Sequence, residues 1–592
     1  MEVTRTFDLL ERLVTLYPKD DIFSRKHNGI WINCSSQEYK EKSHILAYAF
    51  LALGLKPFDK VITICNNRQE WNFIDMGLSL AHLVHVPVYP TLGTDEYQHI
   101  FKHSDATIII VGNESIYKRI NPVISSMDTP PDVYSIDEVP GIKNLSELYT
   151  LGTNNSQKYY SQIEENKRTI DENDLATIIY TSGTTGTPKG VMLSHKNLVF
   201  TFIGSAVQQI RDHNHKMLSF LPLCHVYERS MNYDYQYLGI STYYAESLGT
   251  IASDLADCHA DGFCAVPRVL EVMYSKFESA GKDLKGVAKL VYQWAFNIAN
   301  KYDYTKNGFL YKTMYGLADK LVYSKWREKL GGKEMLVVSG GSAIQEKIVR
   351  LFTAAKMYIF EGYGMTETSP IIAVNNPKEM IIKIGTVGKP TVGTDLKIAE
   401  DGEILTRGPH VMLGYYKDPE YTKSVIDEEG FFHTGDIGTM VDGIFLKITD
   451  RKKEIFKLSS GKYIAPQVIE TMLTESSYIE NCMVVGENQK FATAIIVPNF
   501  ENLRSWAVKN KISFSTNEEL INSSEVKQKM NQEIDMINKR LSDYEQIKRA
   551  RMVNDEWTPL NDMLSPTLKL KRAKIYQKYK NIINDIYKIE VI

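Results

Sequence analysis

A short segment rich in glycine and hydroxyl side chains carries the strongest chemical signal in this chain. Residues 180–190 read Tyr-Thr-Ser-Gly-Thr-Thr-Gly-Thr-Pro-Lys-Gly and lie between the apolar runs 176–179 and 191–193. Glycine lets backbone N–H groups approach an anion closely, the hydroxyls donate hydrogen bonds, and Lys189 adds positive charge. The pattern predicts a loop that holds polyphosphate.

Two other interpretations of this loop fit less well. The P-loop of nucleotide hydrolases requires Gly-Lys-Ser/Thr after a four-residue gap from its first glycine, whereas Pro188 precedes the lysine here. A flexible linker would continue the low-complexity pattern that Pro188 and Lys189 interrupt. The residues expected to contact phosphate are Thr181, Ser182, Gly183, Thr184, Thr185, Gly186 and Lys189.

Two later segments each run from an apolar stretch into glycine. Residues 335–342 end in Ser-Gly-Gly-Ser, and residues 357–367 end in Glu-Gly-Tyr-Gly-Met-Thr-Glu. Strands that end in glycine can place bare backbone against a flat base, as an adenine site requires. Read alone, Glu367 could equally be an acidic residue that begins a helix.

The overall composition excludes several classes of protein. A chain of 592 residues is too long for one hydrophobic core, so two or more domains are expected. A net charge of -3 gives no basic field for nucleic acid, and six cysteines without a Cys-x-x-Cys pair indicate free thiols in a reducing cytoplasm. No apolar run of about 18 residues could span a bilayer, and the first residues lack a secretory signal. A cytoplasmic protein is expected, with peripheral contact at the inner membrane face left open.

The elements that must position these segments can be read from periodicity. In the first 170 residues, apolar runs at 61–64, 84–89 and 107–111 alternate with helix-like stretches, which predicts βα units and a parallel sheet. The polar stretch 153–167 is expected to form an approach to the phosphate loop. Further on, one helical face in 284–330 predicts packing and not chemistry. Its apolar residues are Leu284, Val287, Val291, Trp294, Ala295 and Ile298.

In this order, the segments resemble the acyl-adenylate-forming superfamily, which contains acyl-CoA synthetases, luciferases and peptide-synthetase adenylation domains. The Glu-Arg pair after His225, the extra helices at 284–330 and the sequence Thr-Leu-Lys at 567–569 are similar to long-chain fatty acid–CoA ligases. The resemblance implies an α/β fold with a large N-terminal domain of doubly wound βα sheets plus a small β-barrel-like part. A smaller, mobile α+β lid domain would follow. The implied boundaries are 1–449, a hinge at 450–454, and 455–592.

The resemblance also implies roles for single residues. Adenine would lie between the segments Gly340, Gly341, Ser342 and Glu361, Gly362, Tyr363, with Tyr363 stacked on it. Thr366 would contact the α-phosphate, and Glu367 with Thr184 would hold Mg²⁺, an ion that prefers one carboxylate plus phosphate oxygens. Asp436 would accept from both ribose hydroxyls, with Arg451 near the ribose.

Three further residues are expected to act in catalysis, namely His225, Lys569 and Lys457. His225 would lie beside the carboxylate of the substrate, although a lone histidine is more often structural. Lys569 is implied as the adenylation lysine, with Lys571 as the weaker candidate. Lys453 corresponds to the pivot of the hinge, and Lys457 to a position that reaches the site in a second conformation. Five tyrosines could line an acyl tunnel or belong to the core, namely Tyr233, Tyr235, Tyr237, Tyr243 and Tyr244.

The implied activity is an AMP-forming ligase that uses ATP, Mg²⁺ and coenzyme A to convert long-chain fatty acids to acyl-CoA through an acyl-adenylate. The nearest alternative is a fatty acyl-AMP ligase or acyl-carrier-protein synthetase, which passes the adenylate to a carrier protein. An aryl or amino acid adenylating enzyme and a non-catalytic nucleotide- or lipid-binding protein are the more distant ones. Acyl chain length, and the choice between monomer and homodimer, are left open.

Overall fold

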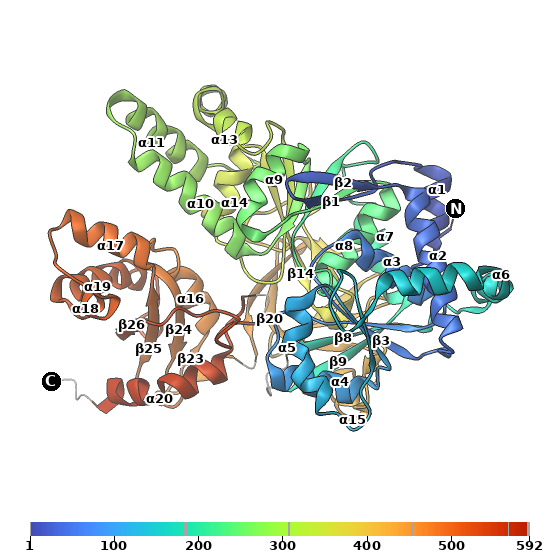
Figure 1. The fold of residues 1–592 in the computed structure, drawn as a ribbon. Coiled ribbons are helices and arrows are strands. Elements are labelled where there is room, and N and C mark those ends of the chain that lie inside the picture. Colours follow the sequence, from blue (N-terminus) through green and yellow to red (C-terminus); the bar gives the residue numbers. More distant parts are fainter. Residues whose placement is uncertain (1, 183–186, 306–307, 453, 566–567, 589–592) are drawn as a thin grey trace.

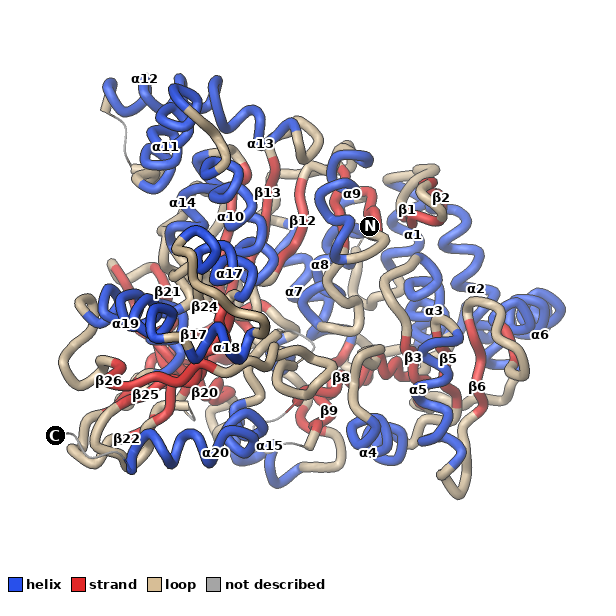
Figure 2. Tube along the Cα trace, turned by 60° about the vertical axis from the view of Figure 1, so that its left-hand side comes forward, coloured by secondary structure: helices blue, strands red, loops and turns tan. Residues whose placement is uncertain are grey.

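The computed structural model describes residues 2–182, 187–305, 308–452, 454–565 and 568–588. Figure 1 shows a large part built from the first three quarters of the chain and a smaller part, coloured orange to red, to one side of it. In the turned view of Figure 2, helices surround the strands of both parts. This arrangement agrees with the α/β architecture that the sequence predicts.

The first large sheet has eight strands in the order β19-β9-β8-β4-β3-β5-β6-β7. Strands β3 to β8 run parallel where they pair, and β8 pairs antiparallel with β9. The apolar runs of the sequence form the buried central strands, as expected. The bounds are β3 (Lys60–Ile64), β4 (Val84–Pro87), β5 (Ile108–Val111), β6 (Asp132–Ser135), β7 (Lys143–Asn144), β8 (Leu175–Ser182), β9 (Pro188–Ser194) and β19 (Gly414–Tyr415).

Helices connect these strands, and one of them corrects a prediction. The polar stretch 153–167 lies inside α6 (Leu145–Thr169), a 25-residue helix, and does not form an approach to the phosphate loop. The side chains of Leu148 and Ile163 are buried, and Gly152 lies so close to Ile45 that a Cβ would be 1.9 Å from its carbonyl oxygen. The polar residues therefore form the outer face of a packed amphipathic helix. The other helices here are α2 (Ser36–Ala52), α3 (Gln69–Leu80), α4 (Thr94–Ser104) and α5 (Glu114–Ser125).

The second large sheet has nine strands in the order β16-β15-β14-β13-β12-β10-β11-β1-β2. The six neighbouring strands β14, β13, β12, β10, β11 and β1 pair in parallel. Their carboxyl ends therefore lie at one edge of the sheet. The strands are β1 (Phe23–His27), β2 (Ile30–Cys34), β10 (Lys216–Ser219), β11 (Ser241–Tyr244), β12 (Gly262–Ala265), β13 (Met335–Ser339), β14 (Met357–Gly364), β15 (Ile371–Val374) and β16 (Lys389–Pro390). The helices are α7 (His195–Ala206), α8 (Val226–Leu238), α9 (Ile251–Cys258), α10 (Pro267–Lys282) and α14 (Glu346–Ala354).

An insertion between β12 and β13 forms α11 (Gly286–Asn300), α12 (Phe309–Ala318), η2 (Asp319–Tyr323) and α13 (Ser324–Glu328). The prediction of helices is confirmed, but the prediction that one face of α11 is a packing face holds only for its second half. Ala295 and Ile298 are buried, whereas Val287 is exposed. The first turns of α11 extend beyond the part of the helix that packs.

The remaining strands form three small sheets. Strands β17 (Asp395–Ile398), β18 (Glu403–Arg407), β20 (Phe432–Val441) and β21 (Phe445–Arg451) make a four-stranded antiparallel sheet, the expected small β part. The smaller part contains β22 (Phe456–Lys457) paired with β23 (Tyr463–Ile464), and a sheet of β24 (Ile479–Val485), β25 (Ala492–Pro498) and β26 (Ile547–Met552). Its helices are α16 (Pro466–Leu473), α17 (Phe500–Lys509), α18 (Asn517–Asn522), α19 (Ser524–Asn538) and α20 (Arg572–Lys588).

Candidate active site

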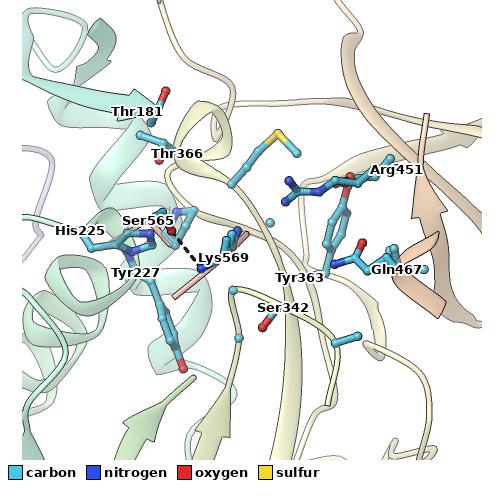
Figure 3. A pocket seen from close by; sticks show the side chains of 18 of the residues that line it. Thr181, His225, Tyr227, Ser342, Tyr363, Thr366, Arg451, Gln467, Ser565 and Lys569 are labelled. Atoms are coloured by element: carbon cyan, nitrogen blue, oxygen red, sulfur yellow. Dashed lines mark hydrogen bonds and ion pairs between the residues drawn. The ribbon is translucent and has the colours of Figure 1, made fainter. Parts of the chain in front are cut away.

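A large cavity of about 2580 Å³ lies where the two parts meet and is lined by residues from both. Its lining includes the β8–β9 hairpin, the ends of β13 and β14, the β20–β21 pair and the loop that precedes α20. Figure 3 shows side chains from these segments pointing toward one another. The cavity thus brings together segments that are hundreds of residues apart in the sequence.

The predicted phosphate loop joins two paired strands. Thr181 of β8 pairs with Lys189 of β9, and both residues line the cavity. The ammonium group of Lys189 lies over the rings of Tyr415 and of Tyr421 in α15 (Pro419–Val425), which favours a cation–π contact. Ser182 ends β8, paired with Pro188. The other predicted phosphate contacts, Gly183, Thr184, Thr185 and Gly186, lie outside the described residues.

The predicted adenine segments follow two adjacent parallel strands. Ser339 of β13 pairs with Glu361 of β14, and the segments Gly340–Ser342 and Glu361–Tyr363 both line the cavity. Gly341 has a φ of +87°, a conformation that L side chains rarely adopt, so glycine is required for this turn. Bare backbone at the carboxyl ends of parallel strands is where open α/β sheets bind nucleotides.

Glu361 is a buried acid at this edge. Burial raises its pKa to about 8, and the N–H of Gly385 donates to Glu361 Oε1 at 3.4 Å. The side chain is therefore mainly protonated at neutral pH. A protonated carboxyl group can donate a hydrogen bond as well as accept one, which suits contact with an uncharged base.

Tyr363, Asp436 and Arg451 form a connected group on the other side of the cavity. Tyr363 Oη donates to Asp436 Oδ2 at 2.7 Å, and Arg451 Nε lies 3.5 Å from Asp436 Oδ1. The register of β20 and β21 places Asp436 opposite Arg451. Burial raises the pKa of Asp436, and Arg451 opposes that shift. The carboxylate is held in one orientation and keeps acceptor sites for further hydroxyl groups.

Thr366 and Glu367 lie in η3 (Thr366–Thr368) directly after β14, and both line the cavity. Tyr415 Oη donates to Glu367 Oε1 at 2.8 Å, and the N–H of Met412 donates to the Glu367 carbonyl at 2.9 Å. Among the described residues, no group of three or more His, Cys, Asp or Glu side chains is arranged to hold a metal ion. A single oriented carboxylate fits Mg²⁺, which takes its remaining ligands from phosphate and water.

His225 is the N-cap of α8 and lines the cavity. The N–H of Tyr227 donates to His225 Nδ1 at 3.2 Å, and burial together with Lys569 lowers the histidine pKa to about 4. The ring is therefore neutral, and because Nδ1 accepts, Nε2 carries the hydrogen. The ring offers the cavity a hydrogen-bond donor.

Lys569 lies inside the same cavity, in the loop before α20. Its N–H donates to Ser565 Oγ at 3.0 Å, and Ser565 N–H donates to its carbonyl at 2.7 Å. Burial, and then Arg451, lower its pKa to about 8. Figure 3 shows Lys569 between His225 and Tyr227 on one side and Tyr363 and Arg451 on the other.

The other predicted lysines are placed differently. Lys571 contacts Asp562 and lies 3.4 Å from Glu96 Oε1 in α4, so it joins the smaller part to the large part. Lys457 is exposed on β22, with its ammonium group 5.5 Å from the centre of the Tyr463 ring, and is not among the described residues that line the cavity. Lys453 lies outside the described residues. Of the predicted lysines among the described residues, Lys569 and Lys571 line the cavity and Lys457 does not.

The tyrosines of α8 and β11, for which a tunnel and the core were both open, lie away from the cavity. None of the five lines the cavity among the described residues, and Tyr233 and Tyr244 are buried in the core. Tyr233 Oη donates to Asp75 Oδ2 at 2.5 Å, and the same carboxylate lies 2.5 Å from Arg229 Nη2. Tyr233 thus satisfies a buried carboxylate of α3, and Tyr244 Oη accepts from Asn72 Nδ2 of the same helix at 2.6 Å.

Sequence reasoning missed several residues of the cavity. Tyr415 orients Glu367, Tyr421 covers Lys189, and Glu96 and Gln467 line the cavity from α4 and α16. Only Tyr415 had a local signal, because it directly follows Gly414. The others are separated from their partners by long stretches of chain, and no local pattern marks them.

Comparison with known proteins places this geometry in a family. The pattern described as "AMP-binding enzyme" matches residues 10–416, and "AMP-binding enzyme C-terminal domain" matches residues 453–590. A peroxisomal long chain acyl-CoA synthetase of Arabidopsis thaliana is 32% identical over 88% of this chain and 77% of its own length. A long-chain-fatty-acid–CoA ligase of Mycobacterium bovis is 29% identical over 98% of both.

Among solved structures, the adenylation domain of a carboxylate reductase from Mycobacterium chelonae superposes with a TM-score of 0.75 at 19% identity, over 99% of this chain and 91% of that one. This likeness concerns the fold alone. Because the family pattern spans most of the large part and its C-terminal pattern spans the smaller part, this chain belongs to the AMP-binding enzyme family.

Proposed function

We propose that this chain is an AMP-forming ligase that activates long-chain fatty acids with ATP to acyl-adenylate and then to acyl-CoA. The observation that carries the proposal is the position of Lys569, which comes from the smaller part and lies in one cavity with His225 and the two glycine-ended strands. The relatives named as long-chain acyl-CoA synthetases support the substrate class. The substrates are thus ATP, CoA and a long-chain fatty acid.

The nucleotide would occupy the edge formed by the first and second sheets. Adenine would lie between segments 340–342 and 361–363, stacked on Tyr363, with the ribose hydroxyls on Asp436 and Arg451 nearby. The polyphosphate would lie against the β8–β9 hairpin, with Thr366 at the α-phosphate. Mg²⁺, when held by Glu367 and Thr184, would neutralise charge on the phosphates.

In the first step, a carboxylate oxygen of the fatty acid attacks the α-phosphorus, a new P–O bond forms, and the bond to pyrophosphate breaks. His225 Nε2–H donates to the bound carboxylate, and Lys569 lies between the attacking and leaving oxygens. The hairpin hydroxyls and Lys189 take charge on the departing pyrophosphate. Positioning and charge neutralisation therefore account for the rate.

In the second step, the smaller part rotates about residues 450–454 and removes Lys569 from the cavity. Rotation brings the β22–β23 face with Lys457 forward, and the pivot is Lys453. The CoA thiolate attacks the acyl carbonyl carbon, a thioester forms, and AMP leaves. One cavity then serves two reactions because its lid is exchanged. Support comes from Lys457, which is exposed and close to the connection between the two parts.

We also propose a reducing, cytoplasmic location, since all six cysteines are buried free thiols. No helix among the described residues is long and apolar enough to cross a bilayer. Whether the chain acts as a monomer or a homodimer is independent of this chemistry, because every residue named here comes from one chain.

The experiment is AMP release from ATP with carboxylic acids of two to twenty carbons, each with and without CoA. CoA-dependent turnover with a maximum at long acids is expected. Turnover with long acids that ignores CoA would replace this proposal by transfer to a carrier protein. Absence of AMP with every acid would contradict a ligase altogether.

A further inference from the structure

The helices α11 and α12 project from the large part and carry exposed apolar side chains. Figures 1 and 2 show them at the outer end of the insertion, away from both large sheets. Val287 is 75% exposed, Leu290 66%, Phe309 87% and Leu310 71%. Monomeric soluble proteins rarely gather apolar side chains of this size on their surface, and when they do, the surface usually binds something.

The helices that carry these exposed side chains are held in place by hydrogen bonds and by buried residues. Tyr323 Oη donates to the carbonyl of Ala295 at 2.6 Å, and Tyr311 Oη donates to the carbonyl of Ile298 at 3.4 Å. The side chains of Ala295 and Ile298 are buried. The second half of α11 is therefore fixed to the body of the protein, and its first turns, with Val287, are held out from it.

The segment that contains these helices carries an excess of positive charge. Segment 282–325 contains eight lysines and three aspartates in a chain whose net charge is -3. Asp303 lies 3.3 Å from Arg350 Nη1 and Asp319 lies 2.6 Å from Arg327 Nη1, and both arginines are outside this segment. Asp319 is thus paired with Arg327 of α13 and Asp303 with Arg350 of α14, and Lys282 pairs with Glu278, so the segment keeps an excess of lysines.

Three of these lysines, Lys285, Lys312 and Lys320, are exposed and lie near the exposed apolar residues in the sequence. Apolar side chains interleaved with lysines match one kind of surface, a bilayer with anionic headgroups, because the apolar groups enter the acyl boundary while the ammonium groups meet phosphate. A protein partner or a second copy of this chain, with net charge -3, would need acidic groups placed opposite each lysine.

We propose that α11 and α12 dock this protein on an anionic lipid bilayer. The helices lie on the bilayer, since none of the described helices is long and apolar enough to cross one. The biological purpose of docking rests on the proposed function. Long acyl chains dissolve in bilayers, so docking would place the enzyme where its substrate collects.

The test is vesicle flotation with the full chain, using phosphatidylcholine alone or mixed with phosphatidylglycerol. The parent chain should float with the mixed vesicles and lose binding as salt rises. The double variants Val287→Asp with Leu290→Asp, and Phe309→Asp with Leu310→Asp, should each lower the partition coefficient at least tenfold. Substituting Lys285, Lys312 and Lys320 together by glutamine should abolish the preference for phosphatidylglycerol and leave the weak binding to phosphatidylcholine unchanged.

Val392→Asp and Val508→Asp are matched controls, because these valines are 74% and 67% exposed but lie outside the insertion. Both should float like the parent. Equal flotation of the helix variants and the controls, or no preference of the parent for anionic vesicles, would overturn the proposal. A parent that sedimented as a dimer and became a monomer in the helix variants would show instead an interface between copies.

Activity separates this inference from the proposed function. With fatty acid dispersed in detergent, all variants should form AMP at the parent rate, because the insertion does not line the cavity among the described residues. Normal flotation without AMP formation would count against the ligase and not against the docking surface.

Discussion

The two walls of the cavity are built in different ways. On the large part, His225 begins α8, and α8 is anchored by Arg229, whose guanidinium is buried 2.5 Å from Asp75 and donates to Thr177 at 2.7 Å. On the smaller part, Lys569 lies on a loop that contacts its own Ser565, and the flanking Leu564 and Leu570 pack in the core of that part alone. A buried polar network fixes the wall on the large part. The wall on the smaller part can move away from the cavity without disturbing the core of the large part.

Several polar contacts between described residues of the two parts hold the second wall in place. Lys571 contacts Glu96, Lys347 Nζ donates to the carbonyl of Glu475 at 2.9 Å, and Arg268 contacts Glu480. The two ion pairs among them have side chains that are 17–32% exposed, and partly exposed pairs of this kind are individually weak. The difference between the walls indicates which residues act in both half-reactions and which in only one.

Arg229→Met should break the fixed wall. Removing one partner leaves Asp75 buried without its cation, and such a change typically costs about 3–5 kcal/mol of unfolding free energy. Urea unfolding followed by circular dichroism measures it. The double variant with Asp75→Leu should recover part of the loss, because no charge is then left unpaired. A single variant as stable as the parent would show that the pair does not anchor α8.

Tyr363→Phe should weaken nucleotide binding on the fixed wall. The phenol donates to Asp436 at 2.7 Å, and a hydrogen bond to a charged group contributes about 1.5–3 kcal/mol, or roughly ten- to a hundredfold. The KM for ATP should rise by this factor with kcat little changed. Tyr358→Phe on the same strand is the control, since its hydroxyl contacts Glu334 at 3.4 Å. Equal effects of the two variants would remove Tyr363 from the nucleotide site.

The pH dependence of adenylation should report Lys569. Its pKa is lowered to about 8 by burial, so the free enzyme carries the protonated ammonium below that pH and loses it above. Only the charged form neutralises developing negative charge, so kcat/KM for ATP should be flat below pH 8 and fall as pH rises through it.

Glu361 also has a pKa of about 8 and provides the control. Lys569→Arg should extend the flat region to higher pH, because arginine stays protonated. Glu361→Gln should leave the fall in place. If Glu361→Gln abolished the fall in kcat/KM above pH 8 and Lys569→Arg did not shift it, the titrating group would be Glu361.

The smallest effect is expected at the contact between the walls. Glu96→Gln removes the charge opposite Lys571, and a partly exposed pair contributes up to about 1 kcal/mol, or roughly fivefold in a population ratio. The ratio of thioester formation to adenylation should rise by up to this factor, and less at high salt. Asp132→Asn, which breaks the exposed pair with Lys143, should change neither rate.

Sequence patterns predicted those segments of the cavity whose chemistry is contained in a few consecutive residues. Glycine and hydroxyl chemistry identified the segment that forms the β8–β9 hairpin, and strands that end in glycine identified the β13 and β14 edge. The family order added Lys569, far along the chain. Contacts such as those of Tyr421 with Lys189 carry no local pattern, because they arise only when the sheets assemble.

The open and the wrong predictions have physical causes of the same kind. The choice between a tunnel and the core stayed open for the tyrosines, because one residue type suits both, and Tyr233 proves to contact the buried Asp75. An amphipathic stripe shows which face of α11 is apolar and not what covers it, so Val287 was expected to pack. In 153–167, polar composition outweighed the helical spacing that places Ile163 in the core.

The central claim is that one cavity serves two reactions with two lysines, and separate assays of the half-reactions test it most directly. Lys569→Ala should lower acyl-adenylate formation about 10²–10³-fold, the range found for a lost transition-state donor, and leave thioester formation from preformed acyl-adenylate near the parent rate. Lys457→Ala should do the reverse. If Lys569→Ala impaired both half-reactions equally, Lys569 would stay in the cavity for both, and exchange of the lid would be contradicted.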